Sequence, residues 1–70
     1  MVIWERSGEA YYATVAGPAG ETLFHLIVES DGDRWDWAVW RPGEDRDQAR
    51  HGRAVMLHGA MWDAEQAATR

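Results

Sequence analysis

The chain has no cysteine, no lysine and no asparagine, and only two of its 70 residues are serine. Without cysteine it can form neither disulfides nor thiolate zinc sites, which commonly support small domains. We predict that residues 1–70 form one domain, and a domain of this size buries only ~60% of its unfolded surface. Stability must therefore come from a dense core or from self-association. Five tryptophans, two tyrosines and one phenylalanine could supply the density.

Charge and hydropathy exclude further classes of protein. Seven basic residues stand against twelve acidic ones, which leaves a net charge of −5. This acidity argues against phosphate binding, so we expect no nucleic-acid partner, although it fits a basic protein partner. No apolar run approaches the ~20 residues that span a bilayer, and no secretory signal is visible. We therefore expect no membrane association and a cytoplasmic location.

The first two-thirds of the chain reads as strands separated by turn signals. Asp31–Asp33 predicts a tight turn, because Asp and Gly tolerate the positive φ angles of primed turns. Pro42–Gln48 is charged and free of apolar residues, which is typical of a mobile loop. Hairpins in series predict an antiparallel meander. The expected strands are Val2–Arg6, Ala10–Ala16, Leu23–Ser30 and Arg34–Arg41, with a short fifth at Ala49–Ala54.

The end of the chain predicts a helix with one face of small residues. Gly59 either caps a helix that begins at Ala60 or lies inside one that begins near Met56, at a cost of ~1 kcal/mol. No Ser, Thr, Asp or Asn stands where a cap is needed. We predict an α+β fold, an antiparallel β-meander of three to five strands with one C-terminal helix packed on one face. The inner helix face consists of Leu57, Ala60, Met61, Ala64, Ala67 and Ala68.

The segment WDWAVW, residues 35–40, should present its tryptophans to two faces of the sheet. In a strand, alternate residues share a face, so Trp35 and Trp37 point one way and Trp40 the other. We expect Trp35 and Trp37 to pack against the alanine face of the helix, because large side chains on one layer fit small ones on the other. Trp40 then lies on the far face, which is partly apolar and which nothing else in the chain covers.

Exposed aromatic residues are the candidate contact sites. A contiguous apolar patch on a small domain usually marks a contact, although tyrosine, tryptophan and charged stems could simply shield one another. If it is a contact, self-association is the simplest case, because symmetric dimers are the commonest oligomers. Trp62, opposite the alanine face, either packs over a sheet edge, which we favour, or meets a partner. The candidate interaction residues are Trp4, Tyr12, Trp40 and Trp62.

No arrangement of residues predicts catalysis, a cofactor or a metal. His25 lies among apolar neighbours in a strand and is expected to be a satisfied core or rim histidine. His51 and His58 do not have the i, i+4 spacing that directs two imidazoles at one metal. The aspartates around Gly32 lack the rest of a calcium loop and its bidentate Glu. Both serines lie beside turns, where nothing suggests a nucleophile. We expect a protein that is not an enzyme.

Several packing residues carry a resemblance over roughly the C-terminal half of the chain. Their order resembles small uncharacterised bacterial proteins that combine a β-meander, a W-x-W-x-V strand, a G-x-A step and an alanine-rich C-terminal helix. It is also distantly similar to the double-stranded-RNA-binding-like fold of HicB-type antitoxins, although the polar cap usual before that helix is absent. The resemblance implies the same fold and no established activity. The matching residues are Trp35, Trp37, Val39, Gly52, Ala54, Ala60, Ala64 and Ala67.

Two hypotheses of function follow from these observations. The first is a non-enzymatic protein-interaction module, a homodimer that self-associates through the apolar sheet face, with an unknown protein partner also open. The alternative is a small acidic inhibitor or antitoxin-like regulator that occupies a basic groove on its target. The acidic surface of that regulator would be formed by Asp36, Glu44, Asp45 and Asp47.

Overall fold

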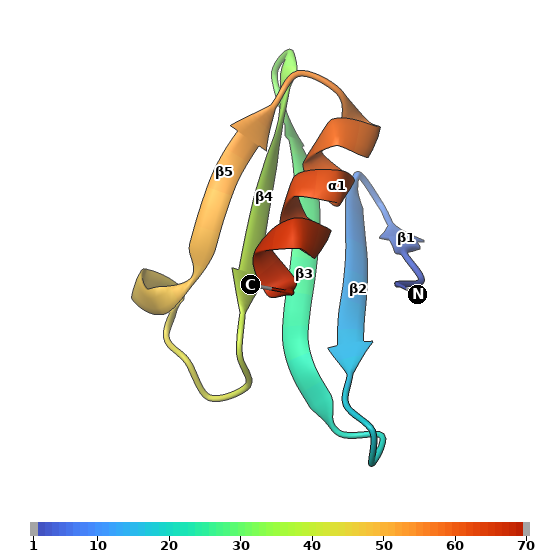
Figure 1. The fold of residues 1–70 in the computed structure, drawn as a ribbon. Coiled ribbons are helices and arrows are strands. Elements are labelled where there is room, and N and C mark those ends of the chain that lie inside the picture. Colours follow the sequence, from blue (N-terminus) through green and yellow to red (C-terminus); the bar gives the residue numbers. More distant parts are fainter. Residues whose placement is uncertain (1, 70) are drawn as a thin grey trace.

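The computed structural model describes residues 2–69, apart from the side chain of Arg46. In this part of the chain, five strands form one antiparallel sheet in chain order, and one α-helix lies across a face of it (Figure 1). The predicted α+β meander with a C-terminal helix is confirmed. No helix within residues 2–69 is long and apolar enough to cross a membrane. The elements are β1 (Glu5–Ser7), β2 (Ala10–Ala16), β3 (Thr22–Asp31), β4 (Arg34–Trp40), a 3-10 helix η1 (Arg46–Gln48), β5 (Arg50–Ala54) and α1 (Leu57–Ala68).

Two tight turns set the register of the sheet. Gly32 has a φ of 63°, and the residues that flank the turn, Asp31 and Arg34, pair with each other. Glycine at the first central position is the signature of a type II′ hairpin turn, whose twist matches that of the strands. Gly8, with a φ of 64°, makes the same kind of turn between β1 and β2. A slip of one residue would turn every side chain to the other face, so these glycines fix which residues are buried.

The element boundaries correct the sequence prediction in two places. The first strand was expected at Val2–Arg6 but runs from Glu5 to Ser7, because pairing with β2 starts at the Gly8 turn and extends back only to Glu5. The segment expected to be a mobile loop contains η1 and is braced by its own side chains. There Glu44 Oε1 accepts the Arg41 backbone N–H at 2.6 Å. The short fifth strand is confirmed.

The helix begins before Gly59, which settles the two alternatives left by the sequence. Met56 is the N-cap residue, with φ −120° and ψ 147°, and its side chain makes no capping hydrogen bond. Gly59 therefore lies inside α1, where it faces the Ala54 side chain on β5. Small residues at this crossing let the helix approach the sheet closely.

The core lies between α1 and the middle strands. Its fully buried large side chains are Leu26, Val28 and Val39, and they meet the buried alanines of α1, which are Ala60, Ala64 and Ala68. Trp37 packs against this core, and its ring crosses β5 at Gly52. Trp35 is half-buried and makes an edge contact with Tyr11, with ring centroids 6.3 Å apart. The predicted packing of Trp37 against the core with the helix alanines is confirmed. Trp35 was predicted to pack there too, but among the described residues its ring contacts Tyr11 instead of that core.

Candidate protein-interaction surface

The sheet face that α1 leaves uncovered is the candidate functional surface, here called the open face. Its side chains form three rows across the strands, which the pairing register defines. The aromatic row lies nearest the open end of the β3–β4 hairpin, the central row follows, and the charged row lies nearest the Gly32 turn. The aromatic row is Thr14, His25 and Trp40; the central row is Tyr12, Ile27, Ala38 and His51; the charged row is Ala10, Glu29, Asp36 and Arg53.

Three aromatic rings from three strands contact one another on this face. His25 stacks on Trp40, with ring centroids 5.3 Å apart and planes 19° apart. Tyr12 reaches His25 diagonally from the central row, and its hydroxyl is hydrogen-bonded to His25 Nδ1. When that hydroxyl donates the bond, a neutral imidazole carries its own proton on Nε2 and can donate it outward. His25 is thus a partly buried histidine with a hydrogen-bond partner, as the sequence predicts.

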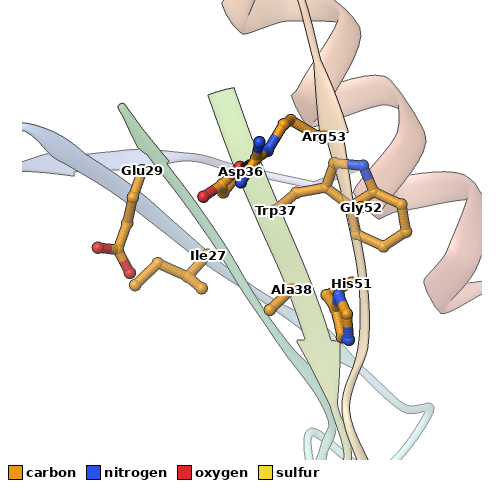
Figure 2. A pocket seen from close by; sticks show the side chains of 8 residues that line it. All are labelled: Ile27, Glu29, Asp36, Trp37, Ala38, His51, Gly52 and Arg53. Atoms are coloured by element: carbon orange, nitrogen blue, oxygen red, sulfur yellow. Dashed lines mark hydrogen bonds and ion pairs between the residues drawn. The ribbon is translucent and has the colours of Figure 1, made fainter. Parts of the chain in front are cut away.

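Two neighbouring hollows make the open face uneven. Both are bounded by Ile27 and Glu29 on one side and by His51 on the other, with the small Ala38 between. The first, of about 330 Å³, extends to Asp36 and Arg53 in the charged row (Figure 2). The second, of about 410 Å³, extends instead toward Trp40, Glu44 and Ala49. The face therefore has recesses that reach the charged row as well as the aromatic ring of Trp40.

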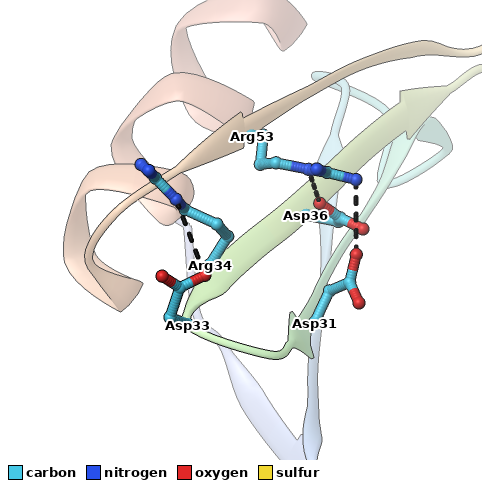
Figure 3. Close-up of polar contacts among 5 residues, drawn as sticks. All are labelled: Asp31, Asp33, Arg34, Asp36 and Arg53. Carbon is cyan, nitrogen blue, oxygen red and sulfur yellow. Dashed lines mark hydrogen bonds and ion pairs between the residues drawn. The ribbon is translucent and has the colours of Figure 1, made fainter.

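The charged row contains two carboxylates, of which Asp36 forms an ion pair with a described residue and Glu29 does not. Arg53 Nε donates to Asp36 Oδ1 at 2.7 Å, and Arg53 Nη2 donates to Asp31 Oδ2 at 3.3 Å (Figure 3). The hydrogen bond to Asp36, followed by the nearby charges of Asp36 and Asp31, raises the pKa of Arg53. Glu29 forms no ion pair with any residue that the structure describes. Glu29 is thus the acidic group of this row whose charge no described residue pairs.

The four predicted contact residues lie in three places. Tyr12 and Trp40 share the open face, as expected. Trp4 lies instead against the helix, where its indole N–H donates to Glu65 Oε2 at 3.3 Å. Trp62 is 62% exposed on α1, so the favoured interpretation, that it packs over a sheet edge, is wrong. A single surface cannot include all four.

Sequence reasoning missed His25 as a member of this surface. The signal was present, because counting back in pairs from the Gly32 turn places His25 opposite Trp40. The pairing of Arg53 with Asp36 could be found in the same way only once the register of β5 was known. Two further contacts had no local signal: Arg41 lies 5.4 Å from the Phe24 ring, and Arg50 donates to the Ala67 carbonyl.

The acidic surface of the alternative hypothesis is divided. Asp36 is engaged by Arg53, and Glu44 accepts a backbone hydrogen bond within its own loop. Asp45 and Asp47 are exposed on the loop around η1. Within residues 2–69, no group of three or more His, Asp or Glu side chains is placed to hold a metal ion.

None of the family models, curated proteins and solved structures compared with this chain matches it. The open face, with its aromatic contacts and its hollows, is the feature of the molecule on which a function can be argued.

Proposed function

We propose that this chain is a protein-interaction module that self-associates through the open face of its sheet. The observation that carries the proposal is the cluster of Tyr12, His25 and Trp40, which lies partly exposed on the sheet face opposite α1. Aromatic side chains are enriched in the buried centres of protein interfaces, because they bury much area with few rotatable bonds. The cluster lies beside the half-buried Ile27 and Ala38, which makes the apolar surface continuous.

The size of the face suits a small symmetric interface. A standard interface takes ~800 Å² from each partner. The accessible surface of this chain is 5062 Å², so such an interface would use about a sixth of it. One broad face of a body with extents of 38 × 25 × 22 Å is of that order. Twofold dimers are the commonest soluble oligomers, which makes a second copy the first partner to consider.

The second candidate function is an acidic regulator that binds a basic groove. It is supported by the exposed Asp45 and Asp47 and by the net charge of −5. It is weakened by the ion pair that Asp36 makes with Arg53, since an engaged carboxylate is less available to a target. Binding of this kind would weaken steeply with added salt, whereas apolar self-association would not. A cytoplasmic location remains a prediction from the sequence.

Sedimentation equilibrium of the wild type and two variants tests the proposal. The wild type should form a dimer, and Trp40→Ser should raise its dissociation constant at least tenfold, because a buried aromatic anchor is lost on both sides. Trp62→Ser is the matched control, since it removes an exposed indole from the helix and should leave the dimer intact. Circular dichroism verifies that each variant is folded. A wild type that stays monomeric at high concentration, or equal effects of the two substitutions, would contradict the proposal.

A further inference from the structure

We infer that the occupant of the open face is a second copy of this chain, related by a twofold axis that runs across the strands along the central row. This inference rests on the proposed function and goes beyond it by fixing how the two copies are oriented on each other. The axis would lay the aromatic row of each copy over the charged row of the other. The unequal ends of the open face lead to this arrangement.

Symmetry limits the choices. A twofold interface is formed by the same patch on both copies, so every contact occurs twice. Facing sheets of the aligned kind keep their strands within ~30° of each other, which leaves a twofold axis that runs either along the strands or across them. An axis across the strands exchanges the two ends of each strand and keeps its place in the sheet. An axis along the strands keeps the two ends of each strand in place and moves the strand to the other side of the axis.

The axis across the strands brings complementary groups together. On β3, His25 would lie over the second copy's Glu29, because they stand at equal distances from Ile27 on either side. The imidazole Nε2–H would donate to a carboxylate that has no ion-pair partner among the described residues. On β4, Trp40 would lie over the second copy's Asp36, which lines the first hollow and accepts a hydrogen bond from Arg53. A guanidinium within ~6 Å of an indole ring is attracted to its face.

The axis along the strands brings like groups together. With that axis between β3 and β4, each charged row would face the charged row of the other copy, and Glu29 would lie over Asp36. Like charges placed opposite each other across an interface cost free energy and select against that arrangement. The two aromatic rows would also meet each other, and the hollow beside Asp36 and Arg53 in each copy would have no aromatic ring opposite it. The contact of His25 with Glu29, made twice, is what favours the axis across the strands.

Thiol crosslinking tests the orientation, and the chain is suited to it because it has no cysteine of its own. Ala10 and Thr14 lie on β2 on either side of Tyr12, in the charged and the aromatic row. Under the inferred axis, Ala10 of one copy faces Thr14 of the other. Facing sheets pack ~10 Å apart, which exceeds the reach of a disulfide, so a short bis-maleimide is the appropriate reagent. The variants are Ala10→Cys and Thr14→Cys, each labelled alone and as an equimolar mixture.

The mixture should give covalent dimers at least tenfold faster than either variant alone. Crosslinking that is no faster in the mixture, from a protein that sediments as a dimer, would overturn the inferred axis and leave the proposed function standing. A protein that sediments as a monomer overturns both, including the case in which the open face serves an unrelated protein. Asp63→Cys on the exposed side of α1, crosslinked alone, measures the rate of random collision.

The contact between His25 and Glu29 has its own readout. Glu29→Gln keeps the shape of the side chain but removes the charge, and a charge-assisted hydrogen bond is about twice as strong as a neutral one. Two symmetric contacts should together weaken the dimer about tenfold. Glu9→Gln makes the same change of charge at the exposed Gly8 turn and is the control. Equal dimer affinity of the two variants would contradict the inferred contact.

Discussion

Gly52 is the residue on which the closest packing between neighbouring strands depends. It stands opposite Trp37 on the helix side of the sheet, and the indole ring lies across it. A Cβ atom added at Gly52 would come within 2.6 Å of the ring. The ring cannot retreat easily, because it packs against the core. Glycine is therefore required here for space, whereas at Gly32 it is required for its positive φ.

Gly52→Ala should lower the free energy of unfolding by ~1–3 kcal/mol, which is the usual cost of overpacking. Gly59→Ala should have the opposite effect, a gain of ~0.5–1 kcal/mol, because Gly59 lies within a helix and an added Cβ meets only an ordinary contact at 3.8 Å. Urea unfolding followed by circular dichroism measures both changes. A Gly52→Ala variant with an unchanged free energy of unfolding would show that Trp37 does not hold the position described.

At the scale of elements, the N-terminus of α1 is not capped by a side chain. Its first turn has no acidic residue, and its N-cap residue, Met56, makes no side-chain hydrogen bond. The helix is held instead by its alanine face against the sheet. Its C-terminal end receives a hydrogen bond from Arg50 on β5 to the Ala67 carbonyl. Packing rather than capping thus determines where this helix forms.

Met56→Ser should stabilise the protein by ~0.5–2 kcal/mol, because the backbone at Met56 already has the extended conformation that a capping serine needs. Met56 is 68% exposed, so little buried surface is lost. Val55→Ser, an equally exposed change one residue earlier, is the control and should not stabilise. Thermal unfolding compares the two variants. An equal gain in stability for Met56→Ser and Val55→Ser would show that the gain does not come from capping.

The elements were predictable from sequence where local patterns determine them. The turn signals, the alternate faces of the WDWAVW strand and the alanine spacing of α1 predict the meander, the helix and the faces of Trp37 and Trp40. Contacts between distant parts of the chain were not predictable. Trp4 and Glu65 are 61 residues apart, and no local pattern brings them together. The exposure of Trp62 likewise depends on how α1 crosses the sheet, which periodicity does not determine.

At the scale of the whole molecule, the sheet has two partly apolar faces, and the helix covers one of them. The helix covers β3, β4 and β5 on one side (Figure 1). The open face keeps the stacked His25 and Trp40, and Trp62 lies apart on α1. A chain of 70 residues with a core of this size gains stability from any surface that it buries in a partner. The central claim is that this partner covers the open face and not the helix.

The indole N–H signals of the five tryptophans test this claim most directly in a ¹H–¹⁵N spectrum recorded over a dilution series. We expect the Trp40 signal to move as the dimer dissociates and the Trp62 signal to stay where it is. Movement of the Trp62 signal with a constant Trp40 signal would place the contact on the helix, and five constant signals in a monomer would remove the contact altogether. Either result would contradict the account.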